Sequence, residues 1–216
     1  MTPAVAAPAR LLLVRHGQTP GNVARTFRGA DGHQDPLNAV GERQAAALAR
    51  ALAERRLPGV RLYASPYRRA AQTGEAIAGV LRVPLHILEG VQEIATGDWA
   101  GRPYIDVAER ADEMRAPDGR YGFPGGESLH RVAERCLRSL DGVRPGGGET
   151  VIVVSHGAAL VALLARLLGR DPEDAWRSGI YGHPNTGMSE LLWPEGGPPT
   201  ALRLADVEHL NGLDED

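Results

Sequence analysis

Short runs of apolar residues, each closed by polar residues or glycine, divide this chain into predicted strands. The first run occupies 11–14 within the segment 10–14, and it ends at polar residues and Gly17. An apolar run of this length without alternation is typical of a strand buried on both faces of a sheet. Similar segments predict the remaining strands at 60–64, 83–88, 151–154, 189–193 and 201–206. The last two of these strands close the domain.

Between these runs the apolar residues recur with helical spacing. In residues 41–56 the apolar side chains lie on one side of a predicted helix. This helix ends at Pro58 and Gly59. A second helix is predicted from Ser65 to about residue 80, because Ser65 can cap it and Pro66 suits its first position. Two further helices are predicted at 127–140 and 158–168.

The alternation of strands and helices predicts an α/β fold of three layers, with a largely parallel central sheet and helices on both faces. Segment 90–126 is rich in Gly, Pro and charged residues, and we expect it to form a small helical cap over a site. Its one helical piece is expected at 105–114. A length of 216 residues suits one domain at 10–210, with a disordered N-terminal tail at 1–9 and a C-terminal tail at 211–216.

Composition narrows the function classes. The formal net charge is −3, and all 24 basic residues are Arg because the chain contains no Lys. Such a surface does not attract nucleic acid or an anionic membrane as a whole, and lysine-based catalysis is excluded. No stretch reaches the roughly 18–20 apolar residues of a membrane span, and 1–9 lacks a secretory signal, so we expect a cytoplasmic protein. The single cysteine, Cys136, is interpreted as a packing residue.

Two of the predicted strands end in the same dipeptide, His-Gly. His16 and Gly17 follow the first strand, and His156 and Gly157 follow the strand at 151–154. Ligands of open α/β sheets bind beyond the carboxyl ends of strands, so both histidines reach one region if these strands are neighbours. One histidine at a strand end is more often structural, but two in one chain favour a functional site.

Charged residues near the strand ends suggest an anion site, although each has an ordinary alternative. Arg15 precedes His16, and a cation there favours anion binding and a neutral imidazole. Arg68 and Arg69 follow the second strand, and arginines can clamp a phosphate with paired hydrogen bonds. Taken singly, each arginine reads as a surface residue, and spacing alone does not mark Glu93.

Six motifs occur in a fixed order between residues 11 and 157. Arg-His-Gly-Gln-Thr begins at Arg15, and Ser-Pro-x-x-Arg-Ala-x-Gln-Thr begins at Ser65 and selects Arg69 over Arg68. The others are Asp-Pro-Leu with Gly-x-x-Gln-Ala at 35–45, Glu-x-x-x-Gly-x-Trp-x-Gly at 93–101, Pro-Gly-Gly-Glu-Ser at 124–128 and Ser-His-Gly at 155–157. Together they resemble the histidine phosphatase superfamily, also called phosphoglycerate mutase-like, in its phosphatase branch.

This resemblance implies a metal-independent site that needs no cofactor, on an α/β domain with a helical cap. His16 is expected to attack phosphorus and form a phosphohistidine, while Arg15, Arg69 and His156 stabilise the charge on the phosphoryl oxygens. Glu93 is expected to protonate the leaving oxygen and then to deprotonate the hydrolytic water. The residues expected to contact the phosphate or the rest of the substrate are Thr19, Asn22, Arg28 and Gly157.

Two departures from the family pattern bear on the substrate. Arg28 stands where the family often has Gln, and a third arginine near the pocket favours a second anionic group on the substrate; the alternative is an exposed loop arginine. The long insertion of the cofactor-dependent mutases is absent, and the short pattern at 97–101 resembles the phosphatase branch.

The leading hypothesis is a phosphomonoester hydrolase whose partner is a small phosphorylated metabolite, with no nucleic acid or membrane and with a homodimer as candidate assembly. A cofactor-dependent phosphoglycerate mutase is the first alternative, and an inactive binding protein on the same fold is the second. A zinc site at His16, His156 and Glu93 is disfavoured because the neighbouring arginines repel a dication. The remaining histidines are interpreted as surface or structural residues: His33, His86, His130, His183 and His209.

Overall fold

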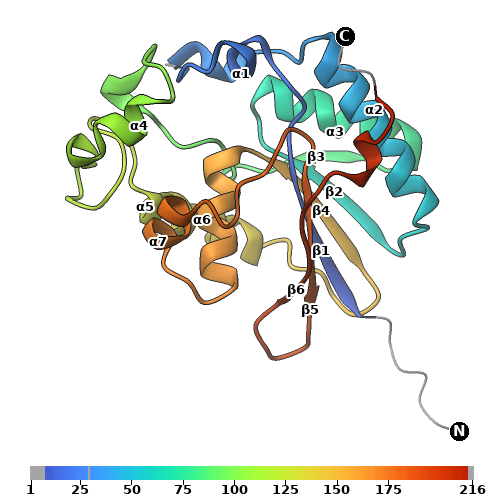
Figure 1. Ribbon diagram of the computed structural model, residues 1–216. Coiled ribbons are helices and arrows are strands. Elements are labelled where there is room, and N and C mark those ends of the chain that lie inside the picture. The colour runs from blue at the N-terminus through green and yellow to red at the C-terminus, as the bar shows by residue number, and fades with distance from the viewer. Residues whose placement is uncertain (1–7, 29, 214–216) are drawn as a thin grey trace, which may run out of the picture.

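A six-stranded sheet forms the centre of the computed structural model, which describes residues 8–28 and 30–213 (Figure 1). The strand order is β3-β2-β4-β1-β5-β6. The first four of these strands are mutually parallel, whereas β5 and β6 pair antiparallel, so the prediction of a largely parallel sheet is confirmed. The strands are β1 (Ala9–Arg15), β2 (Val60–Ala64), β3 (Leu85–Ile87), β4 (Thr150–Ser155), β5 (Met188–Trp193) and β6 (Thr200–Asp206).

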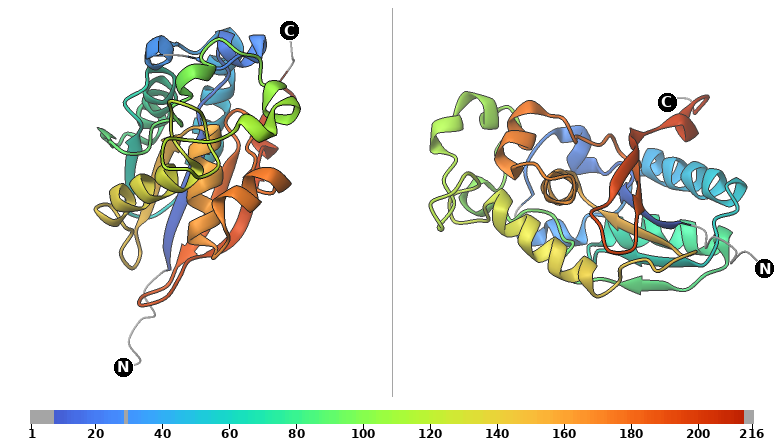
Figure 2. Two further views of the ribbon diagram at one scale, coloured as in Figure 1. Left: turned by 90° about the vertical axis from the view of Figure 1, so that its left-hand side faces the viewer. Right: turned by 90° about the horizontal axis from the view of Figure 1, so that it is seen from below.

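Helices cover both faces of the sheet, as the alternation of elements predicts (Figure 2). Successive residues of β1 point to opposite sides. Leu11 and Leu13 join the core under α5 (Leu129–Asp141) and α6 (Gly157–Leu167), and Leu12 and Val14 join the core under α2 (Ala39–Glu54) and α3 (Arg68–Leu81). All four are fully buried, which explains the unbroken apolar run. The helices are α1 (Pro20–Ala24), α2 (Ala39–Glu54), α3 (Arg68–Leu81), α4 (Asp106–Glu109), α5 (Leu129–Asp141), α6 (Gly157–Leu167) and α7 (Pro172–Ser178).

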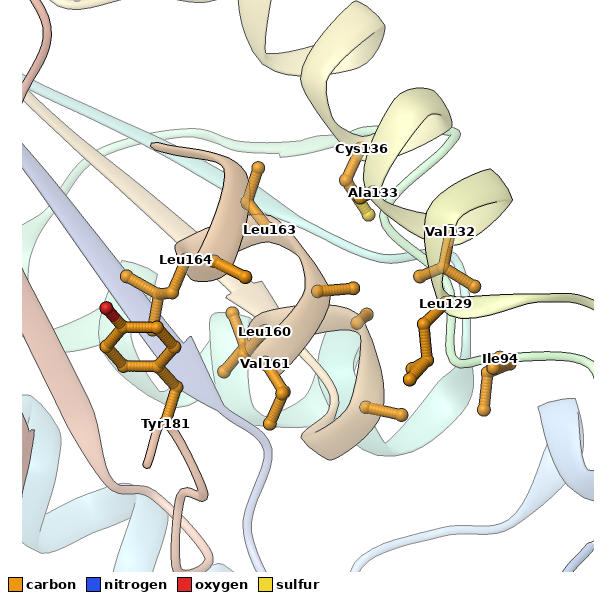
Figure 3. Packing of buried hydrophobic residues seen from close by; sticks show 14 of the residues in the cluster. Ile94, Leu129, Val132, Ala133, Cys136, Leu160, Val161, Leu163, Leu164 and Tyr181 are labelled. Carbon is orange, nitrogen blue, oxygen red and sulfur yellow. The ribbon is translucent and has the colours of Figure 1, made fainter. Parts of the chain in front are cut away.

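Helix α6 is buried on nearly all sides, between the sheet and α5 (Figure 3). Leu160 and Leu163 lie in the same cluster as Val132 and Cys136 of α5. Burial raises the pKa of the Cys136 thiol to about 12, so the thiol stays protonated and the packing interpretation is confirmed. This rigid helix begins directly after His156, and it therefore fixes the position of the second His-Gly turn.

Two predicted helix starts are wrong. Helix α3 begins at Arg68, and its N-cap is Tyr67 without a side-chain cap, because the Ser65 hydroxyl is used elsewhere. The oxygen of Ser65 accepts from the N–H of Tyr67 and bonds to His156. Helix α5 begins at Leu129, since Ser128 caps it by accepting from the N–H of Arg131.

The predicted loop after β1 and the region after α6 each contain a short helix that periodicity does not reveal. Both helices have a local start signal: Thr19 caps α1 and Asp171 caps α7, each followed by proline. Helices of five and seven residues show too few turns for an apolar stripe to appear.

The cap is attached to the loop after α1. Its expected helix at 105–114 is instead the short α4 followed by a 3-10 turn, Ala111–Glu113. Backbone hydrogen bonds join Phe27 to Arg102 and to Gly101, and the N–H of Tyr104 donates to the carbonyl of Arg25 over 2.8 Å. In Figure 1 the α4 segment therefore lies at the same end of the molecule as α1.

The chain termini bear on the predicted tails. Residues 1–7 and 214–216 lie outside the described residues, and Ala9 already belongs to β1. Among the helices of the described part, none has the length and apolar character needed to cross a membrane.

Candidate active site

The two His-Gly turns meet at one edge of the sheet. Strands β1 and β4 are parallel neighbours, with Arg15 level with Ser155, so His16 and His156 leave the sheet side by side. Their ring centroids are 5.1 Å apart. The predicted convergence of the two histidines is confirmed, and the parallel register is its cause.

Hydrogen bonding fixes the tautomer of His16. Nδ1 lies 2.7 Å from the carbonyl oxygen of Gly17, an acceptor, so Nδ1 carries the proton. Nε2 accepts from Nε of Arg69 over 3.0 Å, which requires a lone pair on Nε2. Burial, with Arg69 and Arg15 adding to it, holds the pKa of His16 well below its ordinary value. His16 therefore presents an unprotonated, nucleophilic Nε2.

The turn that carries His16 leaves no room for side chains. A Cβ at Gly17 would lie 2.6 Å from the carbonyl oxygen of Gly41, and one at Gly41 would lie 2.1 Å from that of Gln18. The start of α2 thus packs backbone to backbone against the turn. This contact holds His16 in place after β1.

His156 is buried directly beside His16. Its Nε2 lies 2.8 Å from the hydroxyl of Ser65, whose oxygen already accepts from a backbone N–H. The hydroxyl can then donate to Nε2, which leaves the proton of His156 on Nδ1, a buried atom without a protein partner among the described residues. Burial and, next, Arg69 lower the pKa of His156, so its imidazole is also neutral.

Two arginines supply the positive charge. Arg69 is 7% exposed, and its Nη1 donates to the carbonyl of Gly32 over 2.5 Å while its Nε faces His16. Arg15 donates from Nη1 to the carbonyl of His183 over 2.6 Å, and its buried Nε has no protein partner among the described residues. Burial lowers the pKa of both guanidinium groups, with Glu93 opposing that shift. Both remain cationic at neutral pH.

The carboxylate of Glu93 lies on the first turn of α6. It accepts from the N–H of Ala158 over 3.3 Å and from that of Ala159 over 3.1 Å, and from its own neighbour Ile94 over 3.0 Å. The N-terminus of a helix favours a negative charge. Gly157 lies between Arg15 and Glu93, since a Cβ there would be 3.7 Å from both side chains.

Sequence reasoning missed the pair that holds Glu93. Arg135 of α5 donates to the backbone carbonyls of Gly90, Gln92 and Glu93 over 2.8–3.1 Å. Glu127 binds Arg135 through both carboxylate oxygens and accepts from the N–H of Ala95. The presence of Glu127 in the Pro-Gly-Gly-Glu-Ser motif was the available signal. Arg135 is thus a positioning residue for the loop that carries Glu93.

The structure places the remaining predicted residues on the pocket wall. Thr19 and Asn22 form a capping box at α1, and the Oδ1 of Asn22 also accepts from Asn185, whose amide donates to the carbonyl of His16. Arg28 is exposed at the rim, in a two-point ion pair with Asp35. The pocket has a volume of about 680 Å³, and all nine predicted residues except the buried His156 are among those that line it.

Metal ligands do not gather here. Among the described residues, no three side chains of His, Cys, Asp and Glu are grouped so that they could hold a metal ion. The cationic charge in the pocket comes from Arg15 and Arg69 instead.

The buried imidazoles predict that stability falls in acid. Burial lowers the pKa of His183 to about 4, with Arg15 contributing and the hydrogen bond to Tyr181 opposing. Below pH 6.5 the imidazole of His183 is protonated in the unfolded chain but stays neutral in the folded chain down to about pH 4. His183 alone therefore lowers the free energy of unfolding by about 2 kcal/mol at pH 5 relative to pH 8. The free energy of unfolding can be measured by urea denaturation at pH 5 and at pH 8. Its fall from pH 8 to pH 5 should be about 2 kcal/mol smaller in His183→Gln than in the wild-type protein. The exposed control His86→Gln should keep the full fall, and an equal fall in all three proteins would contradict the assignment.

Known proteins share this arrangement of strands, helices and motifs. The family model described as histidine phosphatase superfamily (branch 1) matches residues 11–206. A glucosyl-3-phosphoglycerate phosphatase of Mycolicibacterium vanbaalenii is 33% identical over 195 residues, covering 85% of this chain and 82% of that protein. An uncharacterised phosphatase of Bacillus subtilis, PhoE, is 35% identical over 162 residues, covering 74% and 78%. A solved mycobacterial glucosyl-3-phosphoglycerate phosphatase superposes with a TM-score of 0.74 at 25% identity, covering 91% of this chain and 98% of that one.

Proposed function

Since the chain belongs to branch 1 of the histidine phosphatase superfamily and is a phosphatase of small phosphorylated metabolites, we propose that it acts through a phosphohistidine on His16. The observation that carries this proposal is the unprotonated Nε2 of His16, 3.0 Å from Nε of Arg69 in a buried pocket. A neutral imidazole beside a fixed guanidinium is a nucleophile with an anion-binding group already in place. The same two groups support metal-independent chemistry.

The first half-reaction moves the phosphoryl group to the enzyme. When the phosphate oxygens accept from Arg69, its hydrogen bond to Nε2 of His16 breaks and frees the lone pair of that nitrogen. Nε2 then attacks phosphorus, the bond from phosphorus to the ester oxygen breaks, and the alcohol leaves in line with the attack. Arg15 and Arg69 bind the equatorial oxygens, where the charge gathers in the transition state. The Nδ1–H of His156 supplies a further donor, and the amide of Asn22 and the rim residues contact the substrate as it enters.

Glu93 is proposed to move the protons. For the first half-reaction Glu93 must be protonated, a state that the negative charge of a bound phosphate favours over the carboxylate, and its carboxyl group then gives that proton to the departing alkoxide. In the second, water attacks phosphorus, the bond from phosphorus to Nε2 breaks, and the carboxylate of Glu93 takes the proton of that water. Inorganic phosphate and the enzyme in its starting state are the products, so the protons balance over one cycle.

The alternatives differ in product and in site. A phosphoglycerate mutase returns the phosphoryl group to its substrate, whereas the proposed enzyme releases inorganic phosphate. An inactive binding protein is expected to have lost a residue of the core set, but His16, Arg69 and Glu93 all line the pocket with Arg15. The homodimer, the cytoplasmic location and the absence of nucleic-acid partners stay predictions.

Replacing Glu93 with Gln tests the proton-transfer role through the leaving group. In EDTA, kcat/KM for an alkyl phosphate should fall about 100-fold, because the alkoxide needs a proton as it leaves. For p-nitrophenyl phosphate, whose phenolate leaves unaided, kcat/KM should change by less than about 10-fold. Slow hydrolysis of the phosphohistidine should then appear as a burst of p-nitrophenol. Equal losses with both substrates would remove Glu93 as the acid, and activity lost in EDTA would overturn the metal-independent mechanism.

A further inference from the structure

Besides the charged residues, the pocket is lined by a set of apolar side chains. His16, Arg15 and Arg69 account for the phosphoryl group. The apolar lining residues come from the loop after α1, from the cap and from helices α6 and α7. Their shared feature is an aromatic or aliphatic side chain facing the pocket, and they are Phe27, Ile94, Tyr104, Val107, Val161 and Trp176.

These walls are held in position by packing and hydrogen bonds. The ring of Phe27 packs against Tyr104 and Phe123 with centroids 4.8 and 5.0 Å apart, and its backbone bonds to the cap. Trp176 packs against the core cluster that contains Tyr121. Ile94 and Val161 belong to the buried core shown in Figure 3. The apolar walls are therefore preformed, and a bound group need not order them.

Among the described residues that line the pocket, Arg28 is the one arginine besides Arg15 and Arg69, and it is already paired with a carboxylate. Nε of Arg28 lies 2.7 Å from Oδ2 of Asp35, and its Nη2 lies 3.0 Å from Oδ1. Asp35 thus binds the Nε–Nη2 edge of the guanidinium and neutralises its charge, and its carboxylate itself lines the pocket. A substrate carboxylate would meet a neutral pair and a negative oxygen. The second anionic group that Arg28 suggested in the sequence is therefore not favoured by the geometry.

We propose that these six apolar side chains bind the alcohol of the substrate, and that the enzyme prefers uncharged alcohols bearing an aromatic or aliphatic ring over alcohols bearing a carboxylate. This inference rests on the proposed function. A pocket of about 680 Å³ has room for a ring beside the phosphoryl group. The ring of Tyr104, which lines the pocket and packs against Phe27, is one of the side chains available to contact such a group.

Three phosphates of primary alcohols test this preference without a large change in leaving group: 2-phenylethyl phosphate, glycerol 3-phosphate and 3-phosphoglycerate. Phosphate release in EDTA should give kcat/KM in that descending order, with about 10-fold or more between the first and the last. The ratio between the first two should fall about 10-fold in Tyr104→Ala. It should stay unchanged in Ile105→Ala, a matched cap variant whose side chain is 57% exposed outside the pocket. Ratios within one protein do not depend on the fraction folded.

Asp35→Asn supplies the complementary variant. Releasing Arg28 from its ion pair should raise kcat/KM for 3-phosphoglycerate relative to glycerol 3-phosphate by several fold. A wild-type enzyme that prefers 3-phosphoglycerate, or a ratio that Tyr104→Ala leaves intact, would overturn the subsite while phosphate release through His16 leaves the proposed function standing. No release from these substrates or from p-nitrophenyl phosphate would overturn both.

Discussion

Replacing His16 with Ala should lower kcat with every phosphomonoester by at least about 10,000-fold, because the nucleophile of a covalent mechanism has no substitute. The imidazole is the only group in the pocket that combines an unprotonated nitrogen with a guanidinium at 3.0 Å, among the residues that the structure describes. Arg15, Arg69 and His156 would still bind phosphate, so the variant should retain affinity for inorganic phosphate while it loses turnover.

The measurement is release of inorganic phosphate in EDTA, with phosphate binding followed by calorimetry. His86→Ala is the matched control, because that histidine is exposed on β3, away from the pocket. It should keep wild-type rates. If His16→Ala retained more than about one hundredth of the activity, the phosphohistidine mechanism would be contradicted, and direct attack of water on the substrate would be indicated instead.

Replacing Arg69 with Ala should lower kcat/KM by about 1,000-fold or more, since a guanidinium on a transferring phosphoryl group stabilises charge that develops only in the transition state. The side chain also donates to Nε2 of His16, and its charge is the largest influence after burial on the lowered pKa of that imidazole. Removing the cation should therefore raise the pKa of His16 and move the acid limb of the kcat/KM profile to higher pH. Arg69→Lys should recover only part of the rate, because an ammonium lacks the fork.

The adjacent Arg68 provides the control for Arg69. Its side chain is exposed at the first position of α3, whereas Arg69 is buried against Gly32 and His16. Arg68→Ala should therefore leave kcat/KM near the wild-type value in the same phosphate-release assay. Similar losses in both variants, or an acid limb that does not move in Arg69→Ala, would show that the lost activity is not specific to the phosphate site.

Strands and convergent histidines are the parts of this molecule that the sequence predicts best. β1 and β4 are buried on both faces, and burial leaves an unbroken apolar run. That the two His-Gly pairs lie side by side then follows from the parallel pairing of these two strands alone. Choosing Arg69 over Arg68 needed the family motif, because both arginines follow the same strand and only packing buries one of them.

Contacts between distant segments are the part that the sequence leaves open. Glu93 owes its position to Arg135, which is 42 residues away, and no spacing rule joins them. Arg28 pairs with Asp35 across a turn, and this pair neutralises the positive charge expected at the pocket rim. Ser65 has the local pattern of a helix cap, but tertiary packing gives its hydroxyl to His156 instead. In each case a polar group found a partner that local propensity does not encode.

Direct detection of the phosphohistidine is the measurement that tests the central claim most closely. The Glu93→Gln protein, mixed with p-nitrophenyl phosphate and quenched in alkaline denaturant, should accumulate the intermediate because its hydrolysis lacks a base. Peptide mapping should place one acid-labile, alkali-stable phosphoryl group on His16. A protein that turns over substrate without phosphorylation at His16, or with the phosphoryl group on another residue, would contradict the account.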